Sequence, residues 1–180
     1  DQLYPGNKKY NQEWQKRAKS IIKLVNDKTF LDEQYMANNT STHIGVTLII
    51  DLSFALCLED IIKFHPDSKI AIEAKKALKK FLDDYLIPSM KTNVFGRVSA
   101  LDEKPEKPYF SPRYHNSYVY VCAKVLADAS VIFDDKNYLD HAEHQIQWAL
   151  GRNHHGLTFV AGAGKKMTAT RTHMAIVKGH

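Results

Sequence analysis

Apolar residues recur along the first part of the chain at steps of three and four residues. Between residues 11 and 26 this stripe consists of Trp14, Ala18, Ile21, Ile22 and Val25. Such spacing places the apolar side chains on one face of an α-helix, so an amphipathic helix is predicted here, with Trp14 as its anchor. The polar run at residues 38–42 then offers N-caps for a second helix.

The next segment, residues 43–64, is apolar on nearly every side. Its β-branched residues at 46–50 would also suit a strand, but the run is too long for a strand and no hairpin turn follows. A buried helix is therefore predicted. A turn at residues 65–68 leads into a third helix with a clean apolar stripe as far as Tyr85.

Pro88 is expected to stop this third helix. Residues 88–115 contain Gly96 and three further prolines after Pro88, so a long loop is predicted. Loops of this length inside a compact domain are usually functional or mobile.

Two more helices are predicted in the C-terminal half, separated by a turn at Asp134 and Asp135. The first covers an apolar stretch from Tyr118 to Phe133, and the second ends at Gly151, which its residue type marks as a C-cap. The second helix is expected to bury Tyr138, Leu139, Ala142, Ile146, Ala149 and Leu150. Trp148 lies beside this stripe and is predicted to belong to the core.

A weak internal repeat links these elements, because a buried helix, an acidic turn and an amphipathic outer helix occur twice. The turns are residues 64–67 and 133–135. Units of this kind bury their inner helices by stacking, in an open α-solenoid or in a closed α/α toroid. The fold class predicted is all-α, built from α/α hairpins, and residues 1–180 are expected to form a single helical domain.

Composition and charge narrow the classes of protein to consider. A chain of 180 residues, 44% hydrophobic, has apolar material for one core. The net charge is +5, but the lysines occur in scattered pairs, so a nucleic acid is not an expected partner. Charged residues interrupt the apolar runs before they reach membrane-spanning length, so a membrane is not an expected partner either. Cys57 and Cys122 lie in apolar helices and are expected to be free. Because the chain starts at Asp1, removal of a leader, tag or larger N-terminal portion is expected.

Four motifs in the C-terminal part follow one another at characteristic spacing. They are Asn116-Ser117-Tyr118, Tyr138-Leu139 with Ala142, Gln145-x-x-Trp148-x-Leu150-Gly151-x-Asn153, and the loop from Thr158 to Gly164. In this order they resemble the C-terminal region of glycoside hydrolase family 9, over roughly residues 111–174.

This resemblance implies that the hairpins form part of an (α/α)6 toroid and that the chain is the C-terminal portion of a larger catalytic domain. The implied activity is inverting hydrolysis of β-linked glucans or related plant polysaccharides by a secreted or periplasmic protein. An oligo- or polysaccharide is the expected partner, together with the remainder of the same catalytic domain, and no cofactor is expected.

Inverting hydrolysis requires one carboxylate as base and one carboxylic acid as proton donor. In the family the base lies in an Asp motif near the start of the catalytic domain, and the acid is a Glu after a His-His-Arg loop. Neither motif is visible here, since Asp83, Asp84, Asp134 and Asp135 resemble helix-end or turn acids. The catalytic residues stay unknown, and a non-catalytic helical module that binds carbohydrate or a protein is the alternative to a hydrolase. An α-solenoid scaffold is a third possibility.

Five residues are candidates for substrate binding. Ungapped alignment puts Thr172-His173-Met174 at the family's His-His-Arg position, so His173 is retained and Arg171 could replace the missing arginine from one position away. Tyr114, His115 and Asn116 precede or begin an inner helix at its rim, where aromatic faces could stack on sugar rings. Loop stabilisation by His173 and ordinary packing of the rim residues are the alternatives.

A metal site is not predicted. His141 and His144 lie three residues apart and share one face of a helix, but the sequence positions no third ligand beside them. His154 and His155 are expected to belong to a loop turn.

Overall fold

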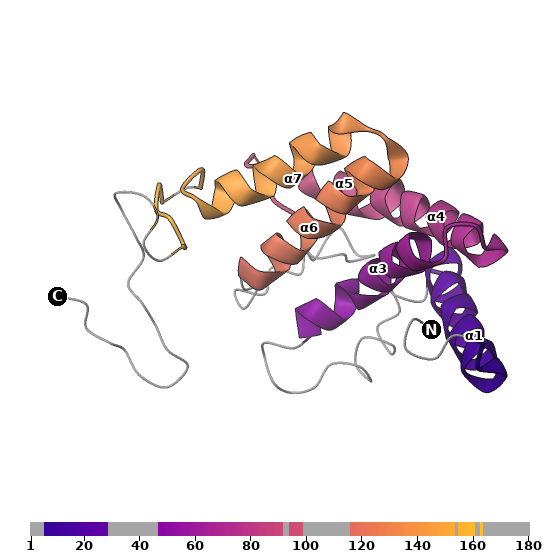
Figure 1. Ribbon diagram of the computed structural model, residues 1–180. Helices are drawn as coiled ribbons and strands as arrows, with labels where there is room; N and C mark the ends of the chain where they lie inside the picture. The colour runs from indigo at the N-terminus through magenta and orange to yellow at the C-terminus, as the bar shows by residue number, and fades with distance from the viewer. Residues whose placement is uncertain are drawn as a thin grey trace, which may run out of the picture.

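The computed structural model describes residues 6–28, 47–91, 94–98, 116–153, 155–160 and 163, without the side chains of 47–51 and 116–118. Within these ranges the chain is helical and contains no β-strand, which confirms the all-α fold class. The helices are α1 (Lys8–Asn26), α3 (Thr47–Phe64), α4 (Lys69–Phe81), the π-helical turn η2 (Leu82–Leu86), α5 (Ile87–Met90), α6 (Asn116–Phe133) and α7 (Lys136–Ala149) (Figure 1).

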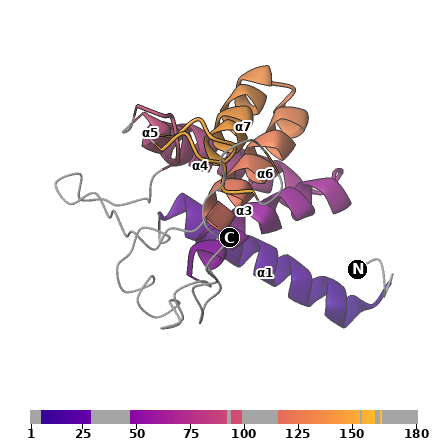
Figure 2. The ribbon, with the colours of Figure 1, turned by 90° about the vertical axis from the view of Figure 1, so that its left-hand side faces the viewer.

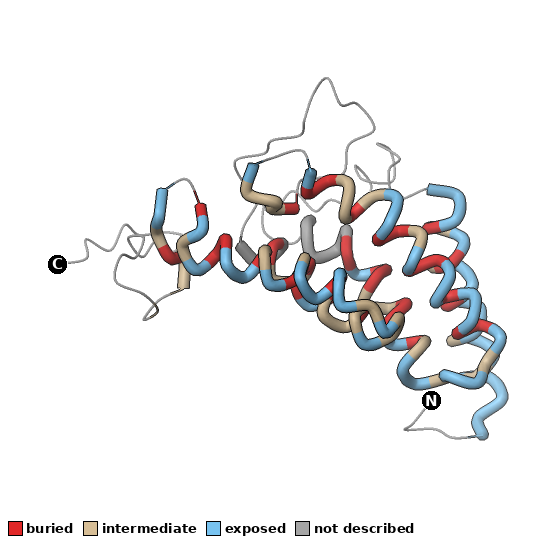
Figure 3. Tube along the Cα trace, turned by 90° about the horizontal axis from the view of Figure 1, so that it is seen from above, coloured by how far each residue is buried: buried red, intermediate tan, exposed pale blue. Residues whose placement is uncertain are grey.

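The helices pair in chain order. α3 packs against α4 and α6 packs against α7, while α3 and α6 also contact each other and α1 lies against both α3 and α4 (Figures 1 and 2). Leu52, Leu58, Val125 and Leu126 are fully buried on the inner helices α3 and α6. The buried positions gather where the helices face one another (Figure 3). Closure of these hairpins into a ring stays a prediction.

Side-chain caps explain where three of the helices begin. The Oδ1 atom of Asn7 accepts a hydrogen bond from the Tyr10 amide at 3.1 Å, which starts α1 three residues before the predicted boundary. Ser68 caps α4 by accepting from the Ala71 amide at 3.0 Å, and Asp135 caps α7 by accepting from the Asn137 amide at 3.0 Å. The predicted turns at 65–68 and 134–135 are confirmed by these caps.

The β-branched run at 46–50 is helical from Thr47 onward, as predicted from its length. Trp14 is only partly buried, and its indole stacks on the imidazole of His65 with ring centroids 4.0 Å apart. Cys57 and Cys122 do not form a disulfide. No helix in the described part of the chain combines the length and apolar character needed to cross a membrane.

The prediction that Pro88 ends the third helix is wrong, because helical structure continues through α5 to Met90. In a regular α-helix the proline ring clashes with the carbonyl four residues earlier, and proline has no amide hydrogen to donate. Here the preceding turn is π-helical, and the Ile87 amide donates to the Leu82 carbonyl five residues back. This wider turn accommodates the proline.

The predicted buried face of α7 is partly wrong. Leu139, Ile146 and Leu150 are 37%, 38% and 49% exposed, whereas Gln145 is fully buried. Tyr138, Ala142 and Ala149 are buried as predicted, and so is Trp148. The buried face is rotated toward Gln145 and Trp148 because residues 94–98 cover that side of the helix.

Candidate functional site

The described parts of two predicted loops, residues 94–98 and 155–160, meet at the C-terminal end of α7. Gln145 holds the first of them. Its Oε1 accepts a hydrogen bond from the Val98 amide at 2.8 Å, and its Nε2 donates to the Gly96 carbonyl at 2.9 Å. Nε2 also approaches the His141 carbonyl at 3.3 Å. A buried amide that satisfies backbone groups of another segment fixes that segment in place.

The conformation of Gly96 explains why a glycine stands in this loop. Its φ of +63° is left-handed, which other residues adopt at a cost. This turn presents the Gly96 carbonyl to Gln145 and allows Arg97 to lie over α7.

Gly151 ends α7 and reverses the chain. Its φ is +123°, its amide donates to the Trp148 carbonyl at 3.3 Å, and the Arg152 amide donates to the Gln147 carbonyl at 2.9 Å. This pair of bonds is the Schellman arrangement, which requires a residue that tolerates positive φ just after the helix. The predicted C-terminal signal at Gly151 is therefore confirmed.

Asn153 fastens the second loop. Its Nδ2 donates to the carbonyls of Trp148 and Leu157 at 2.9 Å and 2.8 Å, and its Oδ1 accepts from the His155 amide at 3.1 Å. The Phe159 amide also donates to the Ala149 carbonyl at 2.9 Å. The loop is thus folded back onto the end of α7.

The indole of Trp148 brings the two loops together. The guanidinium carbon of Arg97 lies 4.6 Å from the Trp148 ring centroid, and the Phe159 ring stacks on the indole at 5.1 Å between centroids. We call these three side chains the Trp148 cluster. Trp148 itself is 7% exposed, so an approaching ligand would meet the half-buried Arg97 and Phe159. A guanidinium and an aromatic face are groups that bind sugar hydroxyls and sugar rings.

The residues predicted to bind substrate are not placed by the structure. Tyr114, His115, Arg171 and His173 lie outside the described residues. Asn116 is the first residue of α6, but its side chain is also outside the description. These five assignments therefore remain predictions.

Two of the acids near the helix ends, Asp83 and Asp135, have structural roles. Asp135 caps α7, as described above, and Asp83 joins α4 to α7 by accepting a 2.6 Å hydrogen bond from the Tyr138 hydroxyl. Lys79 lies 3.0 Å from the Asp83 carboxylate and donates to the same hydroxyl at 3.0 Å. The hydrogen bond to Tyr138, with that to Asp83, raises the pKa of Lys79. Burial, and then the hydrogen bond to Asp83, raise the pKa of Tyr138.

Glu59 is a buried acid that the sequence analysis missed. It is 4% exposed between α3 and α6, and its Oε2 accepts from the Lys124 ammonium at 3.2 Å. Its Oε1 has no hydrogen-bond partner among the described residues. Burial, opposed by Lys124 and reinforced by Asp128, raises the pKa of Glu59 to about 8. The available signal was an acid inside one predicted buried helix and a lysine inside another.

A raised carboxyl pKa beside a second carboxylate invites comparison with a glycosidase acid pair. The Lys124 ammonium, however, binds both Glu59 and Asp128, at 3.2 Å and 2.5 Å. Two carboxylates that bind the same ammonium are too close together to be the catalytic pair of an inverting glycosidase. The two carboxyl groups of such a pair are roughly 6.5–9.5 Å apart, which leaves room for the attacking water. We therefore assign Glu59 to the helix interface.

His141 and His144 lie on one side of α7, with ring centroids 6.4 Å apart. Burial lowers the pKa of His141, and the neighbouring His144 lowers it further. Within the described ranges no group of three or more His, Cys, Asp or Glu side chains is placed to hold a metal ion. The pair therefore gives no basis for a metal centre in this part of the chain.

Comparisons with known proteins assign the chain to no family. No protein-family model matches it, and no curated protein or solved structure does. The resemblance to glycoside hydrolase family 9 thus rests on the sequence motifs alone.

Proposed function

We propose that the chain belongs to a family 9-like glycoside hydrolase and binds a β-linked glucan, or a related plant polysaccharide, at the loops held by the C-terminal end of α7. The observation that carries the proposal is the Trp148 cluster. It combines Arg97 from one loop with Phe159 from the other on a single rigid support. A toroidal arrangement of the hairpins and a secreted or periplasmic location form part of the same proposal.

The residues of the family-like motif support the proposal through the positions they hold. Gln145 fixes residues 96–98, Gly151 turns the chain, and Asn153 folds residues 155–159 back. The motif thus has a physical purpose, which is to set two loops side by side. Packing alone would not need a buried glutamine and a buried asparagine, since buried polar side chains cost free energy unless they bond specific partners.

Binding and hydrolysis are separate parts of the proposal. The Arg97 guanidinium can donate several hydrogen bonds to sugar hydroxyls, and the Phe159 ring can pack against the apolar face of a sugar. Inverting hydrolysis needs two well-separated carboxyl groups in addition. We expect the purified 180-residue chain to bind glucan without hydrolysing it, and release of reducing sugar by this chain would contradict that expectation.

The second candidate is a non-catalytic helical module that binds carbohydrate or a protein partner. The structural roles of Asp83 and Asp135, and the Lys124 contact of Glu59, favour it. Sequence flanking this chain distinguishes the two: an Asp motif upstream and a Glu downstream support the hydrolase, and their absence supports the module.

The test is isothermal titration of the 180-residue chain with cellohexaose, a soluble β-linked glucan. Arg97→Ala removes the guanidinium, and Phe159→Ala removes the ring. Each is expected to weaken binding about ten-fold, the effect of losing one or two hydrogen bonds or one stacking contact. Arg17→Ala on α1 is the matched control, because Arg17 is exposed and bonds only Glu13 among the described residues. Equal affinities for Arg97→Ala, Phe159→Ala and the unmodified chain, with unchanged circular dichroism, would refute the site.

A further inference from the structure

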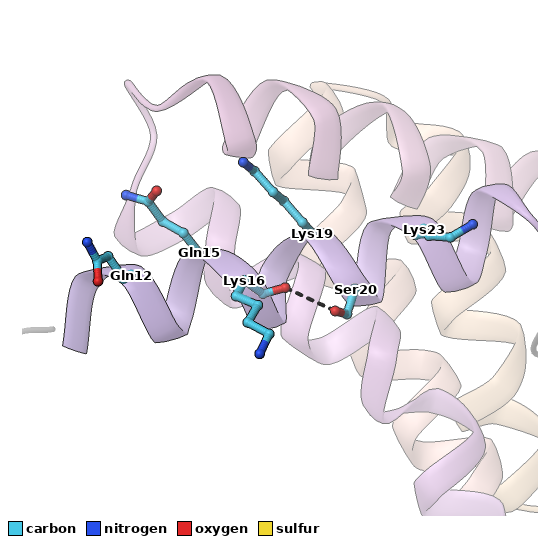
Figure 4. A pocket seen from close by; sticks show the side chains of 6 residues that line it. All are labelled: Gln12, Gln15, Lys16, Lys19, Ser20 and Lys23. Atoms are coloured by element: carbon cyan, nitrogen blue, oxygen red, sulfur yellow. Dashed lines mark hydrogen bonds between the residues drawn. The ribbon is translucent and has the colours of Figure 1, made fainter. Parts of the chain in front are cut away.

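A second candidate surface lies on the outer side of α1. Six side chains border a shallow, open depression there, and all of them come from this one helix (Figure 4). They are Gln12, Gln15, Lys16, Lys19, Ser20 and Lys23. We call this set the α1 face. Every member is polar or charged, so a partner held there is bound by hydrogen bonds and ionic contacts.

Three of the six residues of the α1 face are lysines, and none of the six is acidic. α1 contains six basic residues and one acid, a net charge as large as that of the whole chain. The one acid, Glu13, bonds Arg17 at 2.9 Å, and Lys23 pairs with Asp27 just beyond the helix. Lys16 and Lys19 form no ion pair with any residue that the structure describes. Their ammonium groups are available to an external anion.

The lysines are spaced along the helix rather than gathered at a point. Lys16 and Lys19 are three residues apart on one face of α1, and the stretch from Gln12 to Lys19 covers about 10 Å of helix axis. Gln12 and Gln15 extend the row toward the N-terminus with amide groups that both donate and accept hydrogen bonds. Such a row suits an elongated polyanion that also carries hydroxyl groups.

The composition of α1 argues against three other kinds of partner: a bilayer, a single-stranded nucleic acid and a protein. Ala18, Ile22 and Val25 on its opposite side are buried against the other helices, so α1 has no free apolar face to insert into a bilayer. The α1 face also lacks the aromatic residues on which single-stranded nucleic acids stack and around which protein interfaces form.

We propose that the α1 face binds an acidic polysaccharide, with the ammonium groups of Lys16 and Lys19 on its carboxylates and the glutamine amides on its hydroxyls. Charge complementarity selects the carboxylates, and charge-assisted hydrogen bonds hold them. α1 lies at the opposite end of the molecule from the C-terminal end of α7 (Figures 1 and 3). It therefore stands independently of the proposed glucan site.

The experiment measures binding of the 180-residue chain to polygalacturonate by isothermal titration at low salt. The double variant Lys16→Gln/Lys19→Gln is expected to weaken binding about five-fold, as befits two exposed ionic contacts. Raising the ionic strength from about 50 mM to about 200 mM should weaken binding by the unmodified chain further, because salt screens exposed charges. Cellohexaose titration of the double variant should be unchanged, which separates this proposal from the first.

The matched control is Lys69→Gln/Lys76→Gln, which removes the same charge from exposed positions on α4. If the control variant binds polygalacturonate with nearly the affinity of the unmodified chain, the result supports a specific site on the α1 face. If both double variants lose the same affinity, binding depends only on the net charge of the protein, and the proposal is overturned. Absence of binding to polygalacturonate overturns it as well. Tighter binding to duplex DNA or to vesicles with anionic lipid than to polygalacturonate would show that the partner is of another class.

Discussion

Replacing Glu59 by glutamine should stabilise the protein, and more so at higher pH. The pKa of Glu59 is raised from 4.5 to about 8 in the folded protein. Between these values the folded state keeps a proton that the unfolded state releases, so folding must take up a proton and its free energy becomes less favourable as the pH rises. The maximum slope is about 1.4 kcal/mol per pH unit.

From pH 5 to pH 7 the unmodified chain should therefore lose about 2–3 kcal/mol of stability through this one group. The glutamine of Glu59→Gln would not titrate, and its carbonyl oxygen could still accept from the Lys124 ammonium, which lies 3.2 Å from the present carboxylate. The difference in unfolding free energy between Glu59→Gln and the unmodified chain should grow by the same amount, about 2–3 kcal/mol, over that range.

Urea unfolding followed by circular dichroism at pH 5, 6 and 7 measures this difference. Glu143→Gln on α7 serves as the control, since it makes the same chemical change at an exposed position. A stability difference for Glu59→Gln that is the same at all three pH values would refute the reasoning, even if the variant were more stable throughout. It would mean that the carboxyl is solvated and ionised in the folded protein.

Two further substitutions probe the end of α7. Gly151→Ala should destabilise the protein by about 1 kcal/mol, because alanine is strained at a φ of +123°. The shift in the midpoint of urea unfolding measures this loss, and an unchanged midpoint would contradict the role of Gly151 as the helix cap. Asn153→Ala should cost about 1–3 kcal/mol by leaving backbone groups of the second loop without partners. Amide hydrogen exchange should then accelerate at Phe159, and retained protection there would count against the role given to Asn153.

The helices could be predicted from the sequence because periodicity reports on local geometry. The apolar spacing around Ile22 and Leu78, and the caps at Ser68 and Asp135, act within one helical turn. The end of α7 at Gly151 could be predicted for the same reason. A chain that reverses direction at a helix C-terminus needs a residue with positive φ just after the helix, and glycine adopts that conformation readily.

The errors arose where distant segments decide the outcome. Gln145 is buried because Gly96 and Val98, nearly fifty positions earlier, present backbone groups to it, and this rotates the buried face of α7 away from Ile146. Periodicity contains no information about such a partner. Likewise Pro88 is accommodated by a local widening of the helix, although proline usually marks a helix end.

Glu59 illustrates the same limit for the chemistry of a site. An acid in an apolar run is ambiguous until the opposing helix is known, and only the packing of α3 on α6 pairs it with Lys124. Of the Trp148 cluster, the sequence analysis placed Trp148 in the core and Arg97 in a long loop, but it did not bring Trp148, Arg97 and Phe159 together. That Arg97 and Phe159 would share one indole depends on the tertiary arrangement.

Attachment of both loops to one helix end has a mechanical consequence. Gln145 and Asn153 are eight positions apart on the same short stretch of chain, so a tilt or slide of α7 would carry residues 96–98 and 155–159 as one body. The spacing between Arg97 and Phe159 should then be insensitive to movements elsewhere in the hairpins. The pair of side chains would turn with α7 as a unit, and the distance between them would stay the same.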